Sequence, residues 1–307
     1  MIRYIIRRLL QMIPVILGTT FIIFMLVFVM PGDPTAGRCG QRPCPQAYVD
    51  AFRAEYNLDQ PVLVQYAMYL GKLVQGDLGI DFYQKTVVEE LAFRWPTTFK
   101  LALIAVIFEA LVGIVSGVIA GIRKGKLSDS AITVLSLAVI SIPIFVIGSV
   151  CQLVFGLWLG WFPVTSAEGT WYQLILPGLI LGSLSVAYVS RLTRTSLVEN
   201  LRADYVRTAR AKGMSNSRAI GVHALRNSLV PVVTFIGADF GALMGGAIVT
   251  EKIFNINGIG NLIYRSISQR DGTALVGTIV CLVMVYLLAN LIVDILYGVL
   301  DPRISRD

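Results

Sequence analysis

Long apolar runs separated by short polar stretches dominate the chain. A helix that crosses the hydrocarbon core needs about 20 mainly apolar residues, whereas the strands of a membrane barrel alternate and are about half as long. Six runs meet or approach the length of a spanning helix: residues 9–30, 101–122, 131–158, 174–189, 229–249 and 273–300. The pattern therefore predicts an all-α membrane protein with six transmembrane helices.

Composition and charge indicate on which side of the membrane each connection between these helices lies. Only 15% of the 307 residues are charged and 55% are hydrophobic, whereas a soluble domain carries roughly a quarter charged residues. Basic residues collect in the N-terminus, in the second and fourth connections and in the C-terminal tail, and the connection 159–171 has none. Because lysine and arginine concentrate on the cytoplasmic side, both termini are predicted to be cytoplasmic. The net charge of +7 thus indicates topology first, and binding to nucleic acid is the weaker interpretation.

This topology divides the chain into three parts. Residues 1–30 form a cytoplasmic N-terminus with an uncleaved first span, residues 31–98 an external segment, and residues 99–307 the other five spans with a cytoplasmic loop at 190–228. The external segment shows two helical patterns, broken at NLDQP and again at GDLG. It is too short for a catalytic domain with a large core of its own, so we expect a small cap over the membrane face.

The four cysteines fall into two pairs of different character. Cys39 and Cys44 lie in the external segment, where oxidising conditions favour a disulfide between them. A zinc site is the weaker alternative, because two cysteines without a nearby histidine cannot complete a tetrahedral shell. Cys151 and Cys281 lie in apolar surroundings and are predicted to be packing residues. We expect no metal site in this chain.

Two acidic residues and two glycine series mark the predicted spans. Asp239 and Glu109 are candidates for a translocation path, because unpaired acids in hydrocarbon are costly; a structural hydrogen bond is the alternative for Asp239. Glycines recur every four residues in the second and the fifth span, and such series let helices approach closely. Helix packing is the favoured interpretation, and a moving or substrate-lining interface at Gly241 and Gly245 is the alternative. The two series are Gly113, Gly117 and Gly121, and Gly237, Gly241 and Gly245.

The cytoplasmic loop contains a short basic helix. The residues DYVRTARAKG continue a helical stripe of mostly apolar character that comprises Val198, Leu201, Tyr205, Thr208 and Ala209. Gly213 is predicted to end this helix, and a second helix then leads into the fifth span. The helix could lie on anionic lipid, but its apolar face ends in alanine and threonine, which favours a shallow groove in a protein.

The same loop carries a family resemblance. DYVRTARAKGMSNSRAIGVHALRNSLVP resembles the cytoplasmic signature loop of ABC importer permeases, E-A-A-x-x-x-G followed by I-x-L-P, with Arg207, Thr208 and Ala209 at the E-A-A positions. Arginine for glutamate and the other departures resemble the dipeptide/oligopeptide/nickel branch. MIRYIIRRLLQMIPV, NLDQPVLVQY, GDLG, SIPIFVIG and NINGIGNLI resemble that branch in the same order along nearly the whole chain. The external segment after the first span is similar to that of its B-type subunit.

The resemblance implies a type I ABC importer permease fold in the cell membrane and a role as half of a translocation path. Its cargo would be di- or oligopeptides, with nickel, glutathione or another small solute as the alternative. The implied partners are a second homologous permease subunit, two cytoplasmic ATPase subunits that carry ATP and Mg²⁺, and an external binding protein facing residues 31–98 and 252–272. This chain itself would hold no cofactor. The loop would be a coupling helix that contacts the ATPase through Tyr205, Arg207, Thr208, Ala209, Arg210 and Gly213.

Other classes of protein fit the sequence less well. The chain has no G-x-x-x-x-G-K-[ST] loop, so it offers no phosphate cradle of an ATPase. An intramembrane protease would need a catalytic pair or a metal in the membrane, and the single histidine, His223, lies in the cytoplasmic loop. A self-contained channel or secondary transporter would show internal repeats or broken helices with clustered polar residues, and we predict neither.

Overall fold

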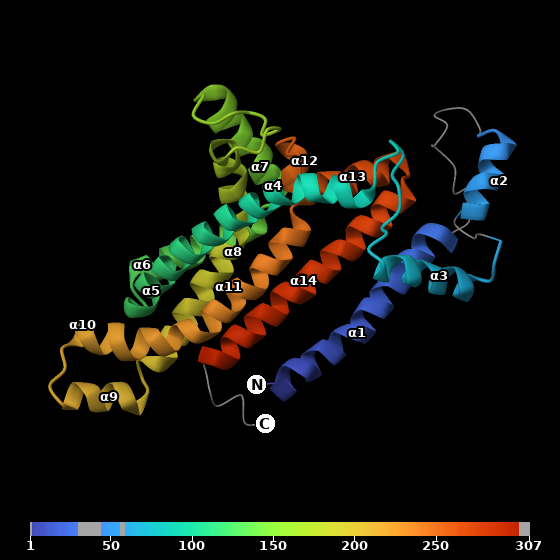
Figure 1. Ribbon diagram of the computed structural model, residues 1–307. Coiled ribbons are helices and arrows are strands. Elements are labelled where there is room, and N and C mark those ends of the chain that lie inside the picture. The colour runs from blue at the N-terminus through green and yellow to red at the C-terminus, as the bar shows by residue number, and fades with distance from the viewer. Residues whose placement is uncertain (1, 30–43, 56–58, 301–307) are drawn as a thin grey trace.

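The computed structural model describes residues 2–29, 44–55 and 59–300, and it is almost entirely helical (Figure 1). The first part of the chain contains α1 (Ile2–Phe24) with its π-helical end η1 (Met25–Val29), α2 (Gln46–Glu55) and α3 (Val62–Val74). The helix α4 (Val87–Phe108) continues through η2 (Glu109–Gly113) into α5 (Ile114–Ile122). Within the described ranges, β-type pairing is limited to an isolated bridge between Ile80 and Thr86.

The second part of the chain follows the same pattern of long helices with short connections. It contains α6 (Leu127–Ser141), α7 (Ile144–Cys151) with η3 (Gln152–Trp158), α8 (Trp171–Asn200), α9 (Asp204–Ala211), α10 (Asn216–Arg218) with η4 (Ala219–Leu225), α11 (Arg226–Gly246), α12 (Ile248–Ile253), α13 (Ile259–Gln269) and α14 (Gly272–Leu300). The start of α1, the end of α14 and α9 lie at one end of the bundle, and α3, α12 and α13 lie toward the other (Figure 1). This arrangement agrees with termini and a loop on one side of the membrane.

Among the described residues, five helices are long and apolar enough to cross a membrane, and a sixth span exists if the bent pair α6–α7 is counted as one. The prediction of an unbroken third span over residues 131–158 is wrong, because α6 and the helix after it meet at an angle of 97°. Pro143 explains the break, since a proline disfavours helical backbone at the residue before it, and Ile142 is extended at φ −97° and ψ 127°.

The helix α8 forms the centre of the subunit. Burial inside the chain covers 61% of its most apolar window, compared with at most 28% in the other long helices. The glycines of α5 let this contact form: a Cβ atom on Gly117 would lie 2.5 Å from the carbonyl oxygen of Ser190 in α8. Gly237 and Gly241 meet α14 in the same way. Close packing of helices is therefore confirmed for the described glycines of both series.

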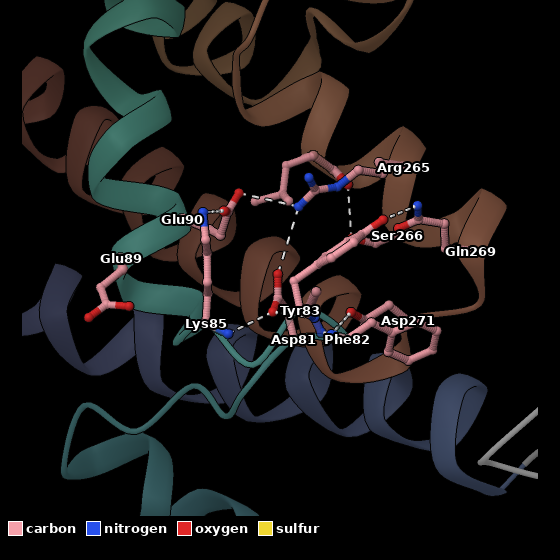
Figure 2. A network of polar contacts seen from close by, with 12 residues as sticks. Asp81, Phe82, Tyr83, Lys85, Glu89, Glu90, Arg265, Ser266, Gln269 and Asp271 are labelled. Carbon is pink, nitrogen blue, oxygen red and sulfur yellow. Dashed lines mark hydrogen bonds and ion pairs between the residues drawn. The ribbon is translucent and has the colours of Figure 1, made fainter. Parts of the chain in front are cut away.

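A polar network fixes the external end (Figure 2). Glu90 forms ion pairs with Arg94 at 2.9 Å and with Arg265 of α13 at 3.2 Å. Asp271 accepts a hydrogen bond from the backbone N–H of Phe82 at 2.8 Å. The segment between α3 and α4 is thereby attached to the turn between α13 and α14, although almost 190 residues separate Phe82 from Asp271 in the chain.

Candidate functional site

The helix α9 is attached to the rest of the chain through its apolar side. Val206 is fully buried and packs with Leu197, Ala219 and Ala224, and Ala209 is nearly buried. The predicted stripe is not one continuous helical face, because residues 201–203 interrupt the helix: Ala209 is buried, whereas Tyr205 and Thr208 are exposed. Since the chain itself covers the apolar face, that face is not available to lipid.

The solvent side of α9 is polar and borders a cavity. Of the six predicted contact residues, Ala209 is buried and the other five are exposed. A cavity of about 680 Å³ opens between α9 and the helix that follows. It is lined by Tyr205, Thr208, Ala209, Lys212, Gly213, Met214, Ser215, Arg218 and His223. Four of the six predicted residues thus line one concave surface, whereas Arg207 and Arg210 lie outside it.

Gly213 makes the reversal between the two cytoplasmic helices. Its φ is +84°, a backbone conformation that side chains with a Cβ atom rarely adopt. Its N–H donates to the carbonyl of Arg210 at 2.9 Å, and the N–H of Met214 donates to that of Ala209 at 3.2 Å. Beyond the turn, a helix runs without a sharp bend from Asn216 to Met244. The turn therefore connects α9 directly to the long helix that enters the membrane.

An ion pair that the sequence analysis missed links this region to the second cytoplasmic connection. Asp129 of α6 is buried and binds Arg194 of α8 through two hydrogen bonds, of 2.5 Å from Nε and 2.8 Å from a terminal nitrogen. The backbone N–H of Gly125 donates to the same carboxylate at 2.9 Å. Because the partners lie 65 positions apart, no local sequence signal indicates this contact.

The two acids predicted for a translocation path come together inside the membrane. Glu109 is fully buried at the start of η2, and Asp239 of α11 is half-buried. Ser185 of α8 donates to Asp239 Oδ2 at 2.6 Å, so the structural hydrogen bond considered for this residue exists. Both Glu109 carboxyl oxygens lack a hydrogen bond of ordinary geometry in the described residues, although Asp239 and Ser185 are close enough to interact with them. We call these three residues the acid cluster.

The remaining predicted positions are simple to place. Gly241 is buried against Ala289 and Tyr286 of α14, and Gly245 lies in α11. Cys44 is disulfide-bonded and Cys39 lies outside the described residues, so their pairing stays a prediction. Cys151 and Cys281 are free thiols. In the part of the chain that the structure describes, no group of three or more His, Cys, Asp or Glu side chains is placed to hold a metal ion.

A second buried acid, Glu251 of α12, organises the external end. Its carboxylate accepts hydrogen bonds from the Thr98 hydroxyl and from the Asn261 N–H, both at 2.8 Å. A Cβ atom on Gly258 would overlap with the carboxylate of Glu251, so a side chain at this position would displace that carboxylate. This site was not predicted from the sequence, although the two glycines of NINGIGN are a signal for close approach of a backbone.

The stability of this external site should depend on pH. Burial raises the pKa of Glu251 to about 7 from 4.5, against the lowering effect of its hydrogen bonds to Asn261 and Thr98. The folded protein therefore keeps a proton that the unfolded chain loses, and stability falls as pH rises from 4.5 to 7. The full effect is on the order of 3 kcal/mol. Thermal unfolding of the purified protein across this range should show the decline.

Glu251→Gln should flatten that dependence, since it removes the titrating group. Glu199→Gln is the control, because Glu199 is an exposed glutamate in α8. A Glu251→Gln profile that falls between pH 4.5 and 7 as steeply as that of Glu199→Gln would contradict the assignment.

Comparison with known proteins defines the class to which this fold and its cytoplasmic loop belong. Residues 113–306 match the family of binding-protein-dependent transport system inner membrane components, and residues 1–102 match the N-terminal part of such components. The chain belongs to this family and is a multi-pass inner membrane permease of a binding-protein-dependent ABC importer.

The similarity to individual relatives extends over the whole chain. The di/tripeptide transport system permease protein DppB of Pseudomonas aeruginosa is 38% identical, over 100% of this chain and 99% of the relative. The glutathione transport system permease protein GsiC of Escherichia coli O6:H1 is 37% identical, over 99% of both. A chain of the MetNI methionine ABC transporter, solved in inward-facing conformations, has a TM-score of 0.58 at 16% identity, covering 70% of this chain and 97% of that one. This last similarity shows a shared type I permease fold.

Proposed function

We propose that this permease forms half of a translocation path for short peptides that an external binding protein delivers. The observation that carries the proposal is the full-length similarity to a di/tripeptide permease and to a glutathione permease. Glutathione is itself a tripeptide, so a short peptide is the cargo class common to both names. A second homologous permease subunit would complete the path.

The energy for transport would come from two partner ATPase subunits, which hold ATP and Mg²⁺. This chain contributes the docking surface: α9 docks through its exposed side in a cleft on an ATPase subunit. Tyr205 and Thr208 line the cavity wall, and Arg207 offers a charge outside it. Grooves that receive a helix or a protruding side chain are a recurrent mode of protein recognition.

The fold offers a mechanical route from that docking surface into the membrane. A displacement of α9 acts on the helix from Asn216 to Met244, because the two pack through Val206 and share the turn at Gly213. That helix carries Asp239, which is bonded to α8. Rigid helices that move as bodies are a common way to transmit such a change. The acid cluster is therefore the place inside the membrane where movement of the loop would change the contact between α11 and α8.

Uptake by a reconstituted system tests the proposal. The chain, its partner permease and the ATPase subunits are placed in proteoliposomes, and the binding protein is supplied outside with a labelled dipeptide, glutathione or a nickel salt. We expect ATP-dependent uptake of a peptide and none with an ATPase that cannot hydrolyse ATP. Uptake that is independent of ATP would instead support a self-contained transporter, and uptake of nickel alone would exclude a peptide cargo.

A further inference from the structure

The external helix α3 exposes apolar side chains on the side that faces away from the protein. Leu63 is 72% exposed and Val74 is 87% exposed, and Met68 is also exposed. Ala67 and Gly71, which lie between them at helical spacing, are exposed too. A helix on the surface of a soluble domain shows the opposite pattern, with polar residues toward water. The exposed face of α3 therefore has the chemistry of a surface that is covered by something apolar.

Contacts with α1 show how deep α3 lies. The hydroxyl of Tyr66 donates to the carbonyl of Leu17 at 2.8 Å and lies 2.8 Å from the Thr20 hydroxyl. Leu17 lies in the interior of the span Ile6–Val27, and the ten residues from Leu17 to its outer end at Val27 correspond to about 15 Å of helix. The tyrosine side chain thus reaches well below the outer end of the first span.

The aromatic side chains set the position of the helix itself. The rings of Tyr66 and Tyr69 pack on Phe24 of α1, with centroids 5.7 and 5.5 Å apart. Phe24 lies three residues before the end of the span. Helix α3 therefore lies beside the outer part of α1 and not beyond it, as Figure 1 shows. Tyrosines are typical of this level of a bilayer, where the ring lies in an apolar layer and the hydroxyl finds a polar partner.

We infer that α3 is embedded in the outer leaflet of the bilayer, with the face of Leu63, Met68 and Val74 in contact with lipid chains. The outer part of α1 also exposes apolar side chains, through Ile22 and Leu26. Lys72 is the only charged residue of the helix and lies in its last turn, from where a long side chain reaches the headgroups.

Lipid is more suited than a water-soluble binding protein to cover the apolar face of α3, because this face lies at the same level as the spanning helix α1. The external segment then has a further attachment to the membrane besides the flanking spans. The covalent connection and the tyrosine contacts hold α3 against α1, and the apolar face holds it in the leaflet. This inference does not depend on which solute the permease transports.

Collision rates of a nitroxide with oxygen and with a water-soluble nickel chelate test the inference. Single labels are placed at Leu63→Cys and Met68→Cys in the assembled transporter in lipid nanodiscs, in a background in which Cys151 and Cys281 are replaced by alanine. Ile22→Cys serves as the lipid-facing control and Asp50→Cys, on the exposed side of α2, as the water-facing control. We expect both α3 labels to match the Ile22 label, with frequent oxygen collisions and at least about fivefold fewer nickel collisions than the Asp50 label.

Two other results overturn the inference. Nickel collisions equal to those of the Asp50 label would place the face of α3 in water. Protection from both reagents would show that a protein partner, such as the second permease subunit, covers it. Leu63→Trp offers an independent measurement, because phospholipids with brominated acyl chains should quench its added fluorescence and should leave that of Asp50→Trp unchanged. Absence of quenching at Leu63→Trp would likewise overturn the inference.

Discussion

Gly213→Val should abolish most substrate uptake while ATP hydrolysis by the assembled transporter continues. Gly213 has a φ of +84°, and no atom lies within 4 Å of the place where a Cβ would be, so the penalty is one of backbone conformation and not of a clash. That penalty is roughly 1–2 kcal/mol for an ordinary residue, and a β-branched side chain is at the unfavourable end. The turn would relax, and α9 would leave the position at which it can transmit force. We expect the amount of substrate imported per ATP hydrolysed to fall at least about tenfold.

Matched glycine variants separate this effect from a general loss of folding. Gly221 lies in η4 with open space around it and without a positive φ, so Gly221→Val should keep uptake near that of the unmodified protein. Gly213→Asn should retain more uptake than Gly213→Val, since asparagine tolerates a left-handed backbone. If Gly213→Val and Gly221→Val import equally well, the position of α9 is not needed for coupling.

The sequence predicts the spanning helices well, because their signal is local and strong. It misplaces the start of the second one, since α4 begins at Val87, far outside the apolar run 101–122. The amphipathic first turns of α4 lie on the external side and lack the apolar run of a span. Their start is nevertheless legible, because Thr86 and Glu89 form a capping box. The proline in SIPIF likewise indicates the bend after Ser141.

The candidate sites were only partly predictable, because some of their residues stand out locally in the sequence and others are brought together only by contacts between distant segments. Glu109 and Asp239 stand out singly as acids in apolar runs, but Ser185, which joins Asp239 to α8, has no such signal. Only the packing of η2, α8 and α11 brings the three together. Which side chains of α9 face the protein depends on a break of three residues after α8, and the spacing of the apolar residues does not reveal this break. Glu251 and Asp129 find partners across the fold, at separations that no local pattern encodes.

Arg194→Ala should destabilise the cytoplasmic half of the permease by about 3 kcal/mol, because it leaves the buried carboxylate of Asp129 without its opposite charge. The side chain of Asp129 is 6% exposed, whereas that of Arg194 is 29% exposed. Asp129→Ala should therefore cost less, since an unpaired arginine at that position still reaches water. Thermal unfolding of the two variants in the same detergent measures the asymmetry. Equal losses would contradict it.

The double variant Asp129→Ala/Arg194→Ala then isolates the pair itself. Once both charges are gone, no buried ion lacks a partner, so the double variant should be more stable than Arg194→Ala alone. Arg194→Lys should not replace the native residue, because an ammonium group cannot form the two parallel hydrogen bonds that the guanidinium makes to Asp129. Because the pair ties α6 to α8 close to Leu197, which packs on α9, its loss should also lower uptake per ATP hydrolysed. A double variant that regains stability but not uptake would assign the pair a role in transmitting force, and one that regains both would limit it to folding.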